Sequence, residues 1–133
     1  MATDGVFTAG QEETITVAKL LRKVKVSVTF WPGGPECSSI EVVCFDAPAQ
    51  PAPGARFRTN GRGQATLTFV VPSSYRQFRE CDFTEPIVPF TNGQPVTVFA
   101  SATHRRGHGR RSKLIWTGAK AQGTAEVPAP AAG

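Results

Sequence analysis

The sequence lacks the patterns that carry enzyme chemistry. It contains no Gly-x-Ser-x-Gly nucleophile elbow, no Gly-x-x-x-x-Gly-Lys-Ser/Thr phosphate loop and no Cys-x-x-Cys pair. Its acidic residues are scattered, and residues 79–82, Arg-Glu-Cys-Asp, place a thiol between carboxylates with no histidine close in sequence. We therefore expect a protein that is not an enzyme and that uses no cofactor.

Long apolar runs are missing as well. No stretch approaches the length that spans a bilayer, and residues 1–7 contain neither the basic nor the apolar part of a secretory signal. We therefore expect a chain that is cytoplasmic as synthesised, with a virion as the other location that fits. No membrane partner is expected.

Cysteine and histidine are scarce. The three cysteines, Cys37, Cys44 and Cys81, are an odd number, which is a poor disulfide framework. Cys44 lies in an apolar stretch and is expected to be a small buried side chain. Cys37 and Cys81 lie in polar segments and could pair if oxidised, but a reducing cytosol favours three free thiols. His104 and His108 are surrounded by arginine and glycine, so we expect no metal site.

What the sequence has instead is an alternation of apolar and polar residues with a period of two, which is typical of half-buried strands. The alternation covers residues 22–31, 64–71 and 95–103. Shorter strands are expected at residues 6–9, 13–18, 39–45, 56–58 and 112–120. A helical turn is expected within residues 73–81. The Pro/Ala-rich residues 47–54 should cross between sheets or follow an edge.

Turns separate these stretches at short intervals. Asn-Gly pairs occur at residues 60–61 and 92–93, and the 13 glycines and 11 prolines disfavour long helices. This predicts an all-β antiparallel sandwich of about seven strands in a single domain, residues 1–126, followed by an extended Pro/Ala-rich tail, residues 127–133. The expected core positions are Val24, Val26, Val28, Phe30, Val42, Cys44, Leu67, Phe69, Val96, Val98 and Ala100.

Two of these stretches resemble a known family. Residues 59–69, TNGRGQATLTF, are similar to the segment of bacterial immunoglobulin-like domains in which a turn precedes Gly-x-Ala-x-hydrophobic-Thr, and residues 96–103, VTVFASAT, resemble their penultimate strand. Such domains occur in surface adhesins and as accessory modules on phage virions. The resemblance implies an Ig-like sandwich and does not by itself fix a function.

The most distinctive segment is the basic loop, residues 104–113. It holds five of the fifteen basic residues and no acidic residue, so the whole net charge of +5 resides there. We expect Arg105, Arg106, Arg110, Arg111 and Lys113 to be exposed at a hairpin tip and to carry any binding of an anion or acidic partner. A merely solvated loop is the equally weighted alternative.

The aromatic side chains in the middle of the sequence admit two interpretations. An exposed strip would indicate stacking on carbohydrate, whereas core packing is favoured because aromatic side chains are usually buried. Phe30 should face inward, and Trp31 should face outward or cap the edge of the sheet. The residues concerned are Phe30, Trp31, Tyr75, Phe78, Phe83 and Phe90.

These observations leave three hypotheses for function. The first is a non-catalytic structural or interaction module, an accessory protein displayed on a phage capsid or tail, whose termini add to a neighbour's sheet edges. The second is a free-standing module that binds an anionic polymer, nucleic acid or acidic polysaccharide, through the basic loop. The third, and least favoured, is an enzyme with an unrecognised site. A homo-oligomer is compatible with the first.

Overall fold

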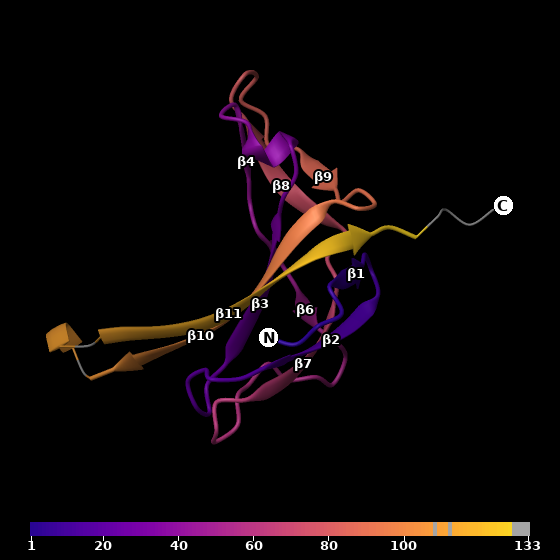
Figure 1. Ribbon diagram of the computed structural model, residues 1–133. Coiled ribbons are helices and arrows are strands. Elements are labelled where there is room, and N and C mark those ends of the chain that lie inside the picture. The colour runs from indigo at the N-terminus through magenta and orange to yellow at the C-terminus, as the bar shows by residue number, and fades with distance from the viewer. Residues whose placement is uncertain (108, 112, 129–133) are drawn as a thin grey trace.

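The regular secondary structure of the described residues consists of β-strands apart from two short 3-10 turns. The computed structural model describes residues 1–107, 109–111 and 113–128, and within these it contains eleven strands, two 3-10 turns and no α-helix (Figure 1). The strands are β1 (Val6–Thr8), β2 (Glu12–Val17), β3 (Val26–Pro32), β4 (Val42–Cys44), β5 (Ala47–Pro48), β6 (Gln50–Pro51), β7 (Ala65–Val70), β8 (Ser74–Arg79), β9 (Ile87–Pro89), β10 (Pro95–Arg106) and β11 (Lys113–Glu126). The 3-10 turns are η1 (Glu36–Ser38) and η2 (Gly109–Arg111).

The strands form three sheets. The largest has the order β1-β11-β10-β3-β5, and the two smaller sheets have the orders β2-β7-β6 and β4-β8-β9. β1 pairs with β11 in parallel, and the other pairs are antiparallel. The all-β prediction is confirmed, but the chain divides into eleven strands in place of about seven. The extra strands are short because proline and glycine interrupt the pairing.

The five-stranded sheet and the β2-β7-β6 sheet share one apolar core. Phe30 on β3 lies between Phe7 on β1 and Phe69 on β7, with edge-to-face ring centroids 5.2 and 5.6 Å away. Such rings bury large apolar areas and favour this geometry. The alternating residues of each strand explain the arrangement, since every second side chain leaves the same face.

The predicted core is largely right. Nine of the eleven expected positions are buried, and the other two, Val24 and Val42, are partly buried against the same core. Residues 47–54 also behave as expected: β5 pairs with β3 at the edge of the large sheet, and β6 pairs with β7 in the β2-β7-β6 sheet. This segment therefore links the two layers.

Three local predictions are wrong. Residues 73–81 contain strand β8 in place of a helical turn, because Tyr75 and Gln77 alternate inward along it. Only Val42–Cys44 of residues 39–45 is a strand, and residues 56–58 contribute a single bridge from Arg58 to Lys25.

The cysteine prediction is corrected too. Cys37 is bonded to Cys44, with 5.4 Å between their Cα atoms, and Cys81 is free and exposed. The three free thiols and the Cys37–Cys81 pair are therefore both wrong. The turn at Gly33-Gly34-Pro35 and η1 fold the chain back beside β4, which sequence spacing alone did not reveal.

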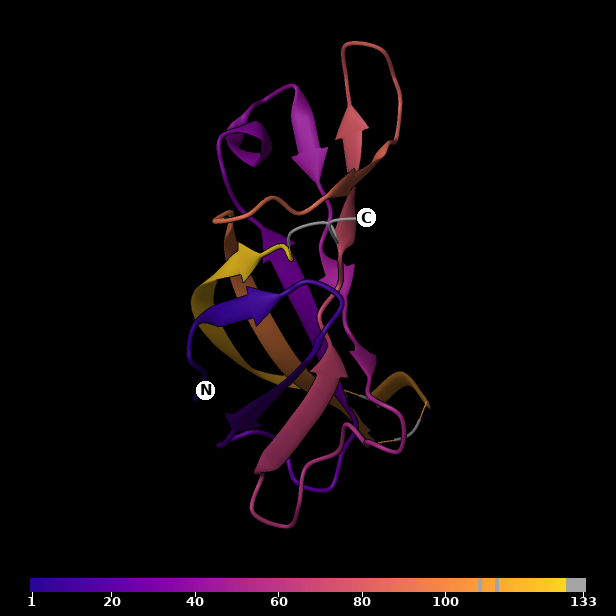
Figure 2. The ribbon, with the colours of Figure 1, turned by 90° about the vertical axis from the view of Figure 1, so that its right-hand side faces the viewer.

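Two parts extend from the shared core in different directions. The β4-β8-β9 sheet forms a lobe at the top of Figure 1, and the paired ends of β10 and β11 form a long ribbon that leaves the body to the left. Figure 2 shows the lobe and the β2–β7 strands at opposite ends of the molecule. Of the tail, residues 129–133 lie outside the described residues.

Candidate basic binding end

A two-stranded arm projects from the large sheet. β10 pairs with β3 only from Val96 to Ala102, whereas its pairing with β11 continues to Arg106, opposite Lys113. Beyond Ala102 the two strands therefore support only each other. We call residues 103–116 the arm. Its position in Figure 1 matches the hairpin that the sequence predicts, although the ribbon is longer than a loop.

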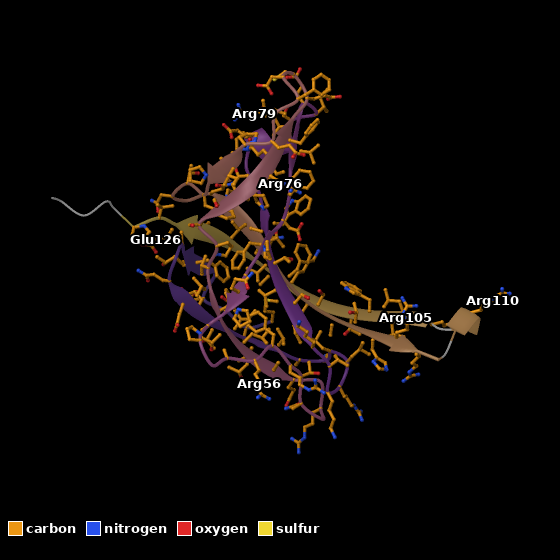
Figure 3. The ribbon with its side chains drawn as sticks, turned by 180° about the vertical axis from the view of Figure 1, so that it is seen from behind. Arg56, Arg76, Arg79, Arg105, Arg110 and Glu126 are labelled. Atoms are coloured by element: carbon orange, nitrogen blue, oxygen red, sulfur yellow. A yellow bond between two sulfur atoms is a disulfide. The ribbon has the colours of Figure 1, made fainter. Side chains whose placement is uncertain are left out.

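The arm carries the predicted basic residues. Arg105, Arg106, Arg110 and Lys113 are exposed, and Figure 3 shows Arg105 along the ribbon and Arg110 at its tip. The side chain of Arg111, together with His108, lies outside the described parts of the chain. For the four described residues the structure agrees with the expected placement, while their binding of an anion stays a prediction.

Two further basic segments lie at the base of the arm. Residues 19–25 and 56–62 are joined by backbone hydrogen bonds, from Lys23 N to Asn60 O and from Thr59 N to Val24 O. We call these two segments and residues 103–113 the basic end. It contains twelve of the fifteen lysines and arginines and none of the ten acidic residues. The seven basic residues outside the arm are Lys19, Arg22, Lys23, Lys25, Arg56, Arg58 and Arg62.

A buried threonine holds the two segments together. Thr59 is 3% exposed, and its hydroxyl donates to the Leu21 carbonyl at 2.6 Å and accepts from the Val24 amide at 3.0 Å. These bonds satisfy backbone groups of a loop that would otherwise lie unpaired beside the core. The lysines and arginines on this loop are therefore displayed from a fixed backbone.

The turn after Thr59 is equally defined. The Asn60 side-chain oxygen accepts from the amides of Arg62 and Gln64 at 2.8 and 3.0 Å. Gly63 follows with a φ of +73°, and a Cβ there would overlap the Leu20 carbonyl oxygen, which only glycine avoids. The carbonyl of Gly63 in turn accepts from the Leu20 amide.

A groove runs between the 20–24 loop and the arm. It has a volume of about 480 Å³, and the side chains that border it include Arg22, Lys23, His104, Arg106 and Ile115. The Leu21 amide donates to the Thr117 hydroxyl at 3.0 Å, which ties the 20–24 loop to β11. Its border is cationic and contains no carboxylate, so the groove suits an anionic group.

The lobe at the other end has the opposite charge. Residues 36–46 and 73–90 contain six carboxylates and two arginines, which gives a net charge of −4. Arg76 lies over the Phe45 ring at 4.7 Å. Exposed apolar side chains accompany the carboxylates: Ile40 is 93% exposed, Phe83 79% and Ile87 74%. The aromatic prediction is thus right for buried Phe30, Tyr75 and Phe90 and wrong for Phe83.

Two carboxyl groups have perturbed pKa values, and neither lies in the basic end. Hydrogen bonds from the hydroxyl and amide of Thr84 lower the pKa of exposed Asp82. Burial, helped by the charge of Asp4, raises the pKa of Glu13 on β2. Both shifts follow from local contacts and do not indicate an acid–base pair.

Histidine and cysteine side chains are few in the described part of the chain. Within it, no three His, Cys, Asp or Glu side chains are grouped as metal ligands would be, and His104 is an exposed residue of β10. Cys81 is exposed at the turn after β8. Across the same described residues, none of the elements is a helix with the length and apolar character needed to cross a membrane.

Sequence reasoning missed part of this surface. Each segment is itself basic, with four cations in residues 19–25, three in residues 56–62 and no carboxylate in either, but the sequence alone does not show that the two lie together. Backbone hydrogen bonds, the bridge from Lys25 to Arg58 and the bonds of the Thr59 hydroxyl bring the segments together. The Asn-Gly turn at residues 60–61 was a usable signal, because it placed Arg58 and Arg62 on either side of one hairpin end.

Comparison of the chain with protein-family models, with curated proteins and with solved structures found no match. The arrangement of charge and strands therefore carries the functional argument alone.

Proposed function

We propose that this chain is a non-catalytic interaction module that docks on an acidic surface through its basic end. In this proposal it is an accessory protein displayed on a larger assembly, such as a phage capsid or tail, and its two layers are a variant of the Ig-like sandwich. The observation that carries the proposal is the projecting arm, whose strands pair only with each other beyond Ala102. A ribbon that contributes nothing to its own core is suited to contact a neighbour.

The charge distribution supports an acidic partner. Twelve basic residues gather at one end, and all ten carboxylates lie elsewhere. Such a separation steers the molecule so that the arm meets a negative surface first, and it repels positive surfaces. The exposed cations contribute little to folding, because exposed charges are screened by water and salt.

The test replaces the arm arginines and follows docking. The variant carries Ser at Arg105, Arg106, Arg110 and Arg111 and should fold almost normally. Co-expressed with the products of the genes beside its own, the native chain should sediment with the assembled particles at a fixed saturating ratio. The variant should remain in the supernatant. Sedimentation of the variant at the native ratio, or neighbouring genes that encode no capsid or tail proteins, would contradict the proposal.

A charge-matched control tests whether docking depends on the arm itself or only on the net charge of the chain. Four exposed residues outside the basic end can be made acidic, which removes the same amount of positive charge as the arm variant. This control should still dock. The substitutions are Gln11→Glu, Gln50→Glu, Ser73→Glu and Asn92→Asp.

A second candidate function is a free-standing module for an anionic polymer, nucleic acid or acidic polysaccharide. The cationic groove beside the arm, with Arg22, Lys23 and Arg106 on its border, favours it. Binding of oligo(dT) should then weaken steeply with salt, and the slope should fall by about three when the four arm arginines are removed. Salt-independent binding, or no binding, would exclude nucleic acid as this polymer.

A further inference from the structure

The outward face of the large sheet carries both tryptophans of the chain. Trp31 on β3 is 49% exposed, and Trp116 on β11 is 61% exposed. The strand register sets Trp31 beside Thr97 and Trp116 beside Thr103 on the central strand β10. Residues 97 and 103 leave the same face because they are an even number apart. The two indoles therefore share one face and lie about 20 Å apart along the strand.

A third aromatic side chain stands between them. Phe99 on β10 is partly exposed on the same face, where its row contains Thr29 of β3 and Lys120 of β11. The positions around these three rings are small or carry hydroxyl or amide groups. We call this surface the outer face, and its other members are Ser27, Thr97, Ser101, Thr103, Gly118 and Gln122.

The ring of Trp116 is seated on the sheet. A Cβ at Gly118 would lie only 2.7 Å from two carbon atoms of that indole, so the ring crosses the space that a side chain would fill. Glycine at this position therefore lets the Trp116 ring lie against the strand while most of it stays exposed. The Trp116 ring therefore has a defined seat on the outward side of the sheet and is not exposed merely because the core lacks room for it.

The charges on the outer face have one sign. Lys120 lies in the Phe99 row, and Arg105 lies in the row beyond Trp116, opposite Leu114. The rows of β3, β10 and β11 from Trp31 to Leu114 contain no carboxylate on this face. Thr97 donates to the side-chain oxygen of Gln122 at 3.1 Å, so both residues present polar atoms on this face.

From these contacts we propose that the outer face binds a polysaccharide that carries carboxylate groups. The flat C–H face of a sugar ring stacks on the negative face of an indole or phenyl ring, and the hydroxyl and amide side chains between the rings match sugar hydroxyls. Lys120 then meets a carboxylate. The outer face shares β10, β11 and Trp116 with the arm, but its ligand stacks on aromatic rings that the docking of the basic end does not use, so it goes beyond the proposed function.

The spacing of cations favours such a polymer over single-stranded nucleic acid. Nucleic acid carries a phosphate for every base, and proteins that bind it line the path with basic residues as well as aromatic ones. Between Trp31 and Trp116 the outer face offers one cation, Lys120, among neutral hydroxyl groups. That sparse charge fits a polymer in which neutral hydroxyls outnumber the anionic groups.

The two tryptophans make the site directly observable. Both lie on the outer face, so the intrinsic tryptophan fluorescence of the folded chain reports on this surface alone. Polygalacturonate should change that emission with saturation, and neutral dextran should bind far more weakly. Trp31→Ala and Trp116→Ala should each reduce the affinity about fivefold to tenfold, measured by affinity electrophoresis. Phe83→Ala, an exposed aromatic on the lobe, should leave the affinity unchanged.

Several outcomes would overturn the assignment. Emission that polygalacturonate does not change would do so, as would native affinity in both tryptophan variants. If oligo(dT) bound more tightly than polygalacturonate, and its binding also depended on Trp31 and Trp116, the ligand of the outer face would be nucleic acid. The two proposals fail separately: Arg110→Ser with Arg111→Ser should leave polygalacturonate binding intact, and Trp31→Ala should leave docking on the assembly intact.

Discussion

The basic end and the lobe extend from one core but differ in the side chains that they expose and in the interactions that hold their backbones. The basic end exposes charge on a backbone that hydrogen bonds define, with Thr59 and Gly63 holding its two loops. The lobe exposes apolar side chains beside carboxylates, and a disulfide between Cys37 and Cys44 ties it. Because different interactions hold the two regions, we expect that each can be altered without the other, provided that the core is left intact.

The largest expected effect comes from breaking the core that both regions share. Phe69 is fully buried and packs edge to face on Phe30 and Phe57. Phe69→Ala should lower the free energy of unfolding by about 3–5 kcal/mol, because it removes apolar contacts and leaves a cavity. Urea unfolding measures it. Phe83→Ala is the matched control on the exposed lobe and should cost about 0.5 kcal/mol or less. Equal losses would mean that burial is misassigned.

The next effect should separate the lobe from the basic end. Replacing Cys37 and Cys44 together by Ala removes the disulfide between two residues that are seven apart in the sequence. The free energy of unfolding should fall by about 2 kcal/mol, because the unfolded chain regains conformational freedom. Hydrogen exchange should accelerate in residues 36–46 and 73–90 and stay unchanged in the arm. Cys81→Ala, at the free thiol, is the control and should change neither. Faster exchange in the arm would contradict the independence of the two regions.

A smaller effect should appear at the basic end alone. Thr59→Val keeps the volume but removes the hydroxyl that bonds to Leu21 and Val24. The unfolding free energy should fall by about 1–2 kcal/mol, because two backbone groups lose their partner. Exposed Thr66→Val on β7 serves as the control. If Thr59→Val leaves stability and the exchange of residues 19–25 unchanged, the hydroxyl does not hold the loop.

The smallest effect concerns the carboxyl with the raised pKa. Because the folded state binds the Glu13 proton more tightly than the unfolded state, this group makes the chain more stable as pH falls toward and through the ordinary value of 4.5. Above the raised pKa its charge is a cost of folding. Glu13→Gln should therefore stabilise the chain at neutral pH by about 0.5 kcal/mol or less and should flatten the pH dependence between pH 4.5 and neutrality. If Glu13→Gln lowered the free energy of unfolding at neutral pH, the direction assigned to the pKa shift of Glu13 would be wrong.

The sequence supports the strand prediction best where alternation is long. In β3, β7 and β10 every second residue is apolar, so the core positions from Val26 to Phe30 and from Val96 to Ala100 follow directly. β8 was missed because the polar Gln77 occupies a buried position. It is satisfied there by contacts with Cys44 and Arg79 that the sequence does not reveal.

The candidate surfaces were predictable only in part. The basic loop stood out because five cations follow one another without a carboxylate. The outer face did not, since Trp31, Phe99 and Trp116 lie far apart in the sequence and meet only through the register of three strands. Long-range pairing and the disulfide depend on how the chain turns back on itself, which local patterns do not encode.

One titration tests the central comparison most directly. Amide NMR signals of the labelled native chain are followed while short poly-glutamate, an acidic polymer, is added at low salt. We expect shifts confined to residues 19–25, 56–62 and the arm, with residues 36–46 and 73–90 unchanged, and loss of these shifts at about 1 M salt. Shifts centred on the lobe, or spread evenly over the surface, would contradict the assignment of binding to the basic end.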